Sequence, residues 1–465
     1  MNPRWKLLLS AGLLSLVGLA CWGLLTPWVQ RSRQPTPAAQ APPTAANPTT
    51  AAASPTPHAT PMPATATTAP YPSPTSSPTP PSAAPAPDLP SAWYAPEPLE
   101  PGPVALFTLH MVDERRGWAT GVSPDTAVAR ILITDDGGQT WQEVTPPRLP
   151  PSDWEPTPQV AFWDADTAWV AYGFLPPEAA TEVPHGVWVT HDRGRTWQWA
   201  TLPAPEDAMP WFTPGFWAVL DAQQAWLLVL LDAGMSHQYT YLVHTQDGGR
   251  SWERLADPYS EAATDLMLMG NTGMAFAPDG RYGWVTKEIG PISAAVWAVT
   301  PDGGHSWQGR ELVPPGLSPD NAFCRTQDPH LWAAGQGAFL ARCYDPTAEG
   351  ERLFVVRVEK DQVAETVAVD APPAAEAQLS FVDPQEGYLA VQPSDEGGTL
   401  IFATHDGGRS WQQVKTVAWQ ARAFSWLPNG TGWALADNGQ EIRLVRTANG
   451  GQSWEMLPTP RLREP

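Results

Sequence analysis

The sequence predicts an all-β protein, a seven-bladed β-propeller preceded by an N-terminal membrane-anchor helix and a disordered linker rich in Pro, Thr and Ala. Three observations support this prediction: an apolar N-terminal stretch, a long region without charge, and an eight-residue pattern that recurs along the rest of the 465-residue chain. Because this pattern is an internal repeat, it is the strongest indication of the fold in this sequence. In chain order the predicted parts are the anchor or signal at 1–33, the linker at 34–102, the propeller at 103–458 and a C-terminal tail at 459–465.

The N-terminal part has the composition of an export signal or a membrane anchor. After Arg4 and Lys6, the stretch 7–29 contains no charged residue. A helix of that length would reach about 34 Å and could cross a hydrocarbon core of about 30 Å. Residues 18–21 (Gly-Leu-Ala-Cys) also resemble a bacterial lipobox, so an uncleaved anchor, a lipoprotein signal and a cleaved secretion signal remain alternatives. We expect a membrane-anchored protein that faces the extracellular or periplasmic side.

The linker begins with a region that carries no charge. Residues 34–87 consist almost entirely of Pro, Ala, Thr and Ser. Such a composition cannot bury enough apolar surface to fold, and its prolines favour the polyproline II conformation. At about 3.1 Å per residue it would extend up to roughly 150 Å. We therefore expect a spacer that holds the folded part away from the membrane.

The recurring pattern is Thr-x-Asp-x-Gly-x-Thr/Ser-Trp, with Asn in place of Asp in the last copy. The copies occupy 134–141, 190–197, 245–252, 300–307, 404–411 and 447–454. Their expected structural residues are Asp136, Trp141, Asp192, Trp197, Asp247, Trp252, Asp302, Trp307, Asp406, Trp411, Asn449 and Trp454. The tryptophans step by 56, 55, 55, 104 and 43 residues, and 104 is two periods. A seventh, degenerate repeat is therefore expected near residue 360, where 353–361 keeps a strand pattern and lacks the turn motif.

The residue types explain why this pattern marks a turn between two strands. An Asp carboxylate accepts hydrogen bonds from backbone N–H groups, glycine adopts positive φ, and hydroxyls close the ends of the turn. Each of the six Asp-box repeats also contains an earlier turn ending in Gly or Ala followed by Trp or Tyr, and the short apolar runs between the turns read as four strands per repeat. Seven such sheets bury their aromatic faces against one another when they close into a ring, which also removes exposed edges.

The eight-residue blocks resemble the Asp-box, or BNR, repeats of sialidase-like propellers, and region 103–458 most resembles the photosystem II assembly and stability factor family. Members of the Asp-box group include sialidases, xyloglucan hydrolases, receptor ectodomains and assembly factors, so the resemblance implies the fold more than an activity. A sialidase would need three arginines converging on a substrate carboxylate, a Tyr–Glu nucleophile and an Asp acid. Only Arg325 and Arg422 fall on expected innermost strands, so catalytic residues stay unknown and the question of an enzyme stays open.

Charge and motifs exclude several other functions. After residue 87 the chain has 48 acidic and 23 basic side chains, a net charge of −25, which repels nucleic acid and anionic lipid. His191, His305 and His405 fall in separate repeats, and no zinc-protease, Walker or Gly-x-Ser-x-Gly motif follows the anchor, so neither a metal nor a cofactor is expected. Cys324 and Cys343 lie in the degenerate repeat, and the sequence leaves a disulfide and two free thiols equally open.

Candidate ligand-binding residues lie in the loops opposite the Asp-box turns, where strand alternation brings the loops between repeats to one rim. They are acids and aromatics: Asp153, Trp154, Glu155, Glu206, Asp207, Trp211, Tyr259, Glu261 and Asp265. The alternative is that these side chains only cover sheet ends or solvate the surface. We expect a monomeric, membrane-tethered, non-catalytic module that binds or assembles with a protein or glycan partner. The alternative function is an extracellular sialidase-like glycoside hydrolase.

Overall fold

The computed structural model describes residues 93–463 apart from 125–127, 150–157, 174–184, 207–211, 235–236, 269, 289–295, 319–321, 345–350 and 395–396. The predicted anchor and most of the predicted linker lie outside the described residues. Within the described part of the chain, no helix is both long enough and apolar enough to span a bilayer.

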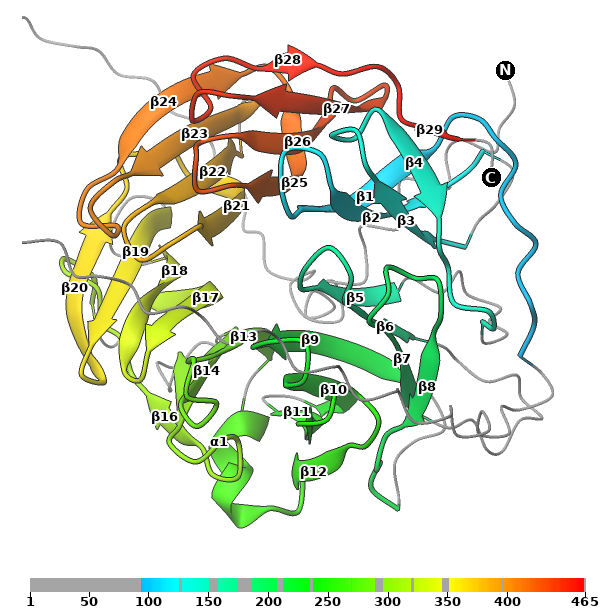
Figure 1. Ribbon diagram of the computed structural model, residues 1–465. Coiled ribbons are helices and arrows are strands. Elements are labelled where there is room, and N and C mark those ends of the chain that lie inside the picture. The colour runs from blue at the N-terminus through cyan, green and yellow to red at the C-terminus, as the bar shows by residue number, and fades with distance from the viewer. Residues whose placement is uncertain are drawn as a thin grey trace, which may run out of the picture. The chain divides into compact units, whose positions relative to one another are not determined.

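Seven sheets, each with four antiparallel strands and one of them with an added fifth strand, follow one another around a ring, which confirms the predicted seven-bladed propeller (Figure 1). Blade 1 consists of β1 (Ala105–Met111), β2 (Gly117–Val122), β3 (Arg130–Thr134) and β4 (Thr140–Glu143). Blade 2 consists of β5 (Pro158–Phe162), β6 (Ala168–Tyr172), β7 (Gly186–Thr190) and β8 (Gln198–Thr201). Blade 3 consists of β9 (Thr213–Val219), β10 (Ala225–Gly234), β11 (His237–Thr245) and β12 (Glu253–Ala256). A 3₁₀ turn, η4 (Glu261–Ala263), and a one-turn helix, α1 (Thr264–Met267), connect blades 3 and 4.

Blades 4 to 7 continue the same order. Blade 4 consists of β13 (Asn271–Phe276), β14 (Gly283–Lys287), β15 (Trp297–Thr300) and β16 (Gln308–Arg310), and blade 5 of β17 (Phe323–Ala333), β18 (Gln336–Tyr344), β19 (Glu351–Glu359) and β20 (Gln362–Ala368). Blade 6 consists of β21 (Ala374–Phe381), β22 (Gly387–Pro393), β23 (Thr399–Thr404) and β24 (Gln412–Val417). Blade 7 consists of β25 (Gln420–Trp426), β26 (Gly432–Asp437), β27 (Ile442–Thr447) and β28 (Glu455–Met456). The first strand of each blade lies innermost in the ring, as Figure 1 shows.

The Asp-box turns join the third and fourth strands, and blade 6 shows how each one is satisfied. The Asp406 carboxylate accepts hydrogen bonds from the Thr404 hydroxyl at 2.8 Å and from the Ser410 amide and hydroxyl at 2.9 and 2.6 Å. Gly407 and Gly408 adopt φ values of 72° and 81°, which other residues resist. The turn is therefore closed by its own polar groups, and the Gly407 amide ties it to the Gln385 carbonyl in the turn between the first two strands of the blade, at 2.9 Å.

The stability that Asp406 contributes can be predicted by comparison with the last Asp box, which has Asn in the same position. In the last box Asn449 reproduces the same contacts, with its Oδ1 accepting from Thr447 and Ser453 and its Nδ2 donating to the Ser453 hydroxyl. Replacing Asp406 by Ala is thus expected to cost about 1–3 kcal/mol of unfolding free energy, and Asp406→Asn less than about 1 kcal/mol. Urea denaturation at pH 7 measures both, and equal costs for the two variants would contradict this account of the turn.

The pH dependence of this contribution follows from the pKa of Asp406. Burial acts to raise it, but the hydrogen bonds from Ser410 and Thr404 outweigh burial and lower the pKa to about 2. A carboxyl whose pKa is lowered on folding stabilises the protein above its ordinary value near 3.8, and this stabilisation disappears as pH falls towards 2. The destabilisation by Asp406→Ala should accordingly shrink between pH 4 and pH 2.

Large aromatic side chains on the second strands fill the space between blades. Trp118, Trp169, Trp226, Trp284 and Trp433 are at most 1% exposed. The Asp-box tryptophans are less uniform, because Trp141 and Trp307 are buried whereas the other four are only half-buried. The Gly-Trp and Ala-Trp turns therefore contribute more to the core than the Asp-box tryptophans that mark the repeat.

Blade 5 is the degenerate repeat expected near residue 360. Its third and fourth strands are joined at Lys360 and Asp361, which have φ values of 52° and 62°. Two consecutive residues with positive φ form the tight hairpin turn that matches strand twist, so a two-residue turn replaces the Asp box. The structure joins Cys324 of β17 to Cys343 of β18, directly opposite in the ladder, by a disulfide.

Contacts between blades 7 and 1 close the ring, and the segments before and after the propeller region pack onto it. The Trp433 indole of blade 7 donates a hydrogen bond to the Gly137 carbonyl of blade 1 at 3.0 Å. Residues 461–462, expected to be tail, form β29 (Arg461–Leu462), a parallel fifth strand beside β4. Residues 93–102, expected to be linker, pack on the propeller because Trp93 buries its indole against Trp199, leaving only 3% exposed.

Candidate functional site

The candidate residues of the rim opposite the Asp boxes are only partly described. Asp153, Trp154, Glu155, Asp207 and Trp211 lie outside the described residues. Glu206 is exposed after β8, whereas Tyr259, Glu261 and Asp265 all lie in the connection between blades 3 and 4. Their role in binding stays a prediction.

The buried side chain of Lys287 fixes the connection between blades 3 and 4, a role that the sequence did not indicate. The Lys287 ammonium donates hydrogen bonds to the carbonyls of Leu266 and Leu268 and to Asn271 Oδ1, at 3.1, 2.8 and 3.1 Å. Burial lowers the pKa of Lys287 to about 7, and the charge of Asp265 acts in the opposite direction. Asp265 also accepts a hydrogen bond from the Gly309 amide at 2.7 Å. In the structure, therefore, Asp265 and Lys287 anchor α1.

The two arginines expected on innermost strands lie there, on β17 and β25. Arg325 pairs with Glu288 at 3.3 Å, and Arg422 donates two hydrogen bonds to Asp437, at 2.9 and 2.7 Å. The seven innermost strands, all of them described, contain no third arginine. The arginine set of a sialidase is thus not assembled from these strands.

A carboxyl group with an altered pKa lies on the innermost strand of blade 5. The ladder between β17 and β18 shifts register between Gln327 and His330, and Asp328 within this bulge has a φ of 51°. Bulges and positive φ at a non-glycine residue are concentrated at functional sites, where they redirect a side chain. Burial raises the pKa of Asp328 to about 6, against hydrogen bonds from Leu379 and Gln327 and the charge of Arg325.

The Asp328 carboxyl is held on one side only. Its Oδ2 accepts hydrogen bonds from the Leu379 amide of β21 at 2.9 Å and from the Gln327 side chain at 3.3 Å. Among the described residues, none donates a hydrogen bond to Oδ1. The Gln327 side chain also donates to the Ala377 carbonyl at 2.6 Å, so it ties β17 to β21. Asp328 therefore has a fixed position.

A second carboxylate comes from the neighbouring blade. Glu376 is exposed near the start of β21, and its charge further raises the pKa of Asp328. Arg342, paired with Glu351, donates to the carbonyls of Ala374 and Ala375 and so positions the backbone that precedes Glu376. Arg325, Glu376 and Gln378 are exposed although they lie on innermost strands, which means that solvent reaches this part of the channel wall.

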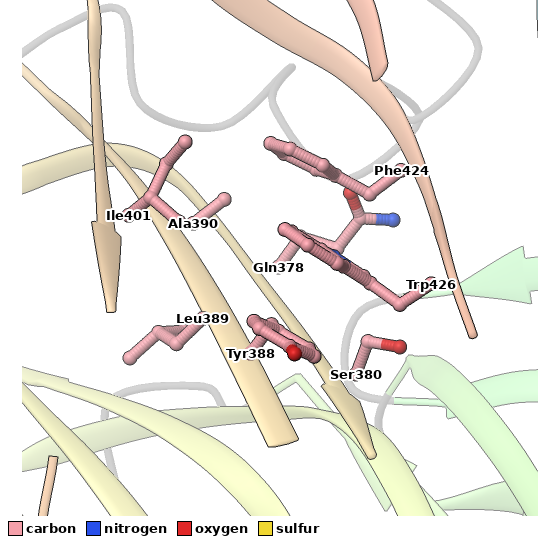
Figure 2. Close-up of a pocket in the computed structure, with 8 residues that line it drawn as sticks. All are labelled: Gln378, Ser380, Tyr388, Leu389, Ala390, Ile401, Phe424 and Trp426. Atoms are coloured by element: carbon pink, nitrogen blue, oxygen red, sulfur yellow. The ribbon is translucent and has the colours of Figure 1, made fainter. Parts of the chain in front are cut away.

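The wall beside these residues, between blades 6 and 7, is closely packed. Figure 2 shows Tyr388 stacked on Trp426, with ring centroids 3.7 Å apart, and Gln378 and Ser380 beside them. The space that they enclose has about 10 Å³, no more than one water molecule needs. This pocket is too small for a ligand, so a substrate at Asp328 and Glu376 would have to lie in the channel itself.

Sequence reasoning missed both carboxyl groups. The one available signal was the dipeptide Asp328-Pro329 inside an expected strand, because proline cannot donate to the ladder and marks a bulge. Nothing local marks Glu376, whose proximity to Asp328 depends on how blades 5 and 6 pack. Because acidic residues are abundant throughout the chain, composition did not single out these two.

Comparison with known proteins identifies the repeat. The model of the BNR/Asp-box repeat matches residues 132–143. No curated protein matches the chain in sequence. Among solved structures, the GH74 xyloglucanase from Xanthomonas campestris is 15% identical, with a TM-score of 0.47 over 80% of this chain and 55% of its own. The chain thus spans little more than half of that enzyme.

Two further structures are a polysaccharide lyase and a sialidase. A PL25 ulvan lyase is 14% identical, with a TM-score of 0.44 over 77% of this chain and 95% of its own. A Hadza microbial sialidase is 15% identical, with a TM-score of 0.35 over 63% of this chain and 69% of its own. The resemblance to photosystem II factors stays a prediction.

The expectation of a non-catalytic binding or assembly module was wrong. The similar structures are enzymes by their names, among them a xyloglucanase and an ulvan lyase, and none of the three is a binding module. The expectation gave too much weight to the missing arginine set. The residues of any catalysis in this chain have to be argued from its own geometry.

Proposed function

The chain is a seven-bladed propeller built from Asp-box repeats, and on that basis we propose that it is a glycoside hydrolase whose active site is the channel wall between blades 5 and 6. The observation that carries the proposal is the pair of carboxyl groups, Asp328 in the bulge of β17 and Glu376 on the adjacent β21. Glycosidic bonds are cleaved by two carboxyl groups with different protonation states, one acid and one base or nucleophile.

The environments of the two groups separate their roles. With a pKa of about 6, Asp328 keeps a proton in about half of the molecules at pH 6 and in about a tenth at pH 7, and it can donate this proton to the oxygen of the leaving sugar. Glu376 is exposed and takes the role of the second carboxyl group, which activates water or attacks the anomeric carbon. Net reaction consumes one water and yields two sugars. Gln378, exposed on the same strand, is positioned to bind substrate hydroxyls.

The substrate class follows from the setting of the site. Because the pair lies on the wall of a channel and not in an enclosed pocket, the proposal favours a polysaccharide chain over a small glycoside. The anchor and linker expected from residues 1–102 would present this site outside the cytoplasm, where such polymers occur. A sialoside is a poorer candidate, since the innermost strands supply no arginine triad.

The test is release of reducing ends from a panel of polysaccharides by the full-length chain, covering β-glucans, xyloglucan, arabinan and pectin, with sialyllactose added. We expect turnover of at least one polymer and a loss of at least 100-fold in Asp328→Asn, since a positioned acid contributes about 10²–10⁴. Asp370→Asn is the matched control, because Asp370 is an exposed acid between the same two blades. No turnover on any substrate, or turnover that survives in folded Asp328→Asn, contradicts the proposal.

A further inference from the structure

A cleft of about 780 Å³ lies between the first and the last blade. It is lined by residues 112–116 of the β1–β2 turn, by Asp135, and by residues 427–429 of the β25–β26 turn. The Gly137 amide of the Asp box donates to the Arg115 carbonyl at 2.8 Å, so this cleft is on the rim of the Asp-box turns. It is therefore separate from the site on blades 5 and 6 and does not depend on the proposed function.

The carboxylates around this cleft are neutralised by arginines. Each of its three carboxylates is already paired: Asp113 with Arg116 at 2.7 Å, Glu114 with Arg446 at 3.2 Å, and Asp135 with both Arg193 and Arg463, at 2.6 and 3.3 Å. The cleft lining thus contains three carboxylates and two guanidinium groups, those of Arg115 and Arg116, and each of the three carboxylates already has an arginine partner.

Arg115 is the arginine of this group that pairs with no carboxylate. Its backbone is fixed, because its amide donates to Asp113 Oδ1 at 2.8 Å and its carbonyl accepts from Gly137. Its Nε donates to the Asp135 carbonyl at 3.2 Å, which orients the guanidinium. Within the described part of the chain, nothing accepts a hydrogen bond from its two terminal nitrogens. An oriented guanidinium whose two terminal NH₂ groups are free suits a carboxylate, which it binds through two parallel hydrogen bonds.

The other walls supply contacts for the remainder of a ligand. Asn429 reaches Glu114 across the cleft at 3.0 Å, and this pair offers both donors and acceptors to hydroxyl groups. Leu427 and Pro428 add an apolar surface. We propose that this cleft binds a sugar acid, with its carboxylate on Arg115, its hydroxyls on Glu114 and Asn429, and a ring face on Leu427 and Pro428. The volume falls within the range of about 300–1,000 Å³ typical of sites for small ligands.

Calorimetric titration of the full-length chain with sodium glucuronate tests this site, with glucose and sodium sulfate as comparison ligands. We expect glucuronate to bind, glucose to bind at least ten-fold more weakly, and Arg115→Gln to weaken glucuronate binding at least ten-fold. Arg281→Gln is the matched control. Arg281 holds the same turn position in blade 4, with its amide on Asp279 at 2.9 Å and its carbonyl accepting from Gly303, but it lies outside the cleft.

Each other outcome overturns the proposal. Equal binding of glucose would mean that the carboxylate is not recognised, and binding of sulfate alone would identify a simple anion site. Unchanged binding in Arg115→Gln, or an equal loss in Arg281→Gln, would place the sugar acid elsewhere. Because Arg115 is exposed, the variant is expected to fold, and a circular dichroism spectrum equal to that of the unsubstituted protein verifies this.

Discussion

Replacing Trp226 by alanine is expected to lower the free energy of unfolding by about 3–5 kcal/mol. Trp226 has no exposed surface and lies between the rings of His244 and Phe276, with centroids 4.2 and 4.0 Å away. Its indole also donates to the Gly303 carbonyl of the next blade at 3.0 Å. Alanine would leave a cavity between blades 3 and 4 and an acceptor without its donor.

Urea denaturation monitored by circular dichroism measures this loss. Trp163→Ala is the control, because Trp163 is 41% exposed and its removal leaves no cavity, so a cost below about 1 kcal/mol is expected. If both substitutions cost the same, stacking of aromatic rings between blades would not be the main support of the ring.

Hydrolysis by the proposed site is expected to fall as pH rises through about 6. Asp328 acts as an acid only while protonated, and its pKa of about 6 sets the basic limb of the profile. Arg325 favours the ionised form of Asp328, so Arg325→Gln should raise the midpoint of that limb. Initial rates between pH 4 and pH 9 measure both, and a limb that is unaffected by Arg325→Gln would assign the titration to another group.

The same carboxyl offers a measurement that needs no substrate. A group whose pKa is raised on folding stabilises the protein below its ordinary value near 3.8, and that stability is lost as pH rises through about 6. Asp328→Asn does not titrate, so its stability relative to the unsubstituted protein should improve from pH 4 to pH 8. A constant difference across this range would show that Asp328 has an ordinary pKa.

Local sequence was sufficient for the blades because each blade is made from contacts within about fifty residues. The Asp-box turns, exemplified by Thr404, Asp406 and Ser410, are satisfied within eight residues, so their pattern can be read directly. The degenerate repeat was predictable from the doubled spacing alone. The two-residue turn at Lys360 and Asp361 was not, since nothing in its composition resembles the motif that it replaces.

The number of repeats, their strands and the turns that mark them were thus determined by the sequence itself, through interactions between near neighbours in the chain. The two candidate sites were decided only by tertiary structure. Asp328 meets the Leu379 amide of the next blade, 51 residues away, and Glu114 meets Arg446 across the closure of the ring, 332 residues away. No local pattern records such pairs, because it is the packing of whole blades that brings these charged groups together.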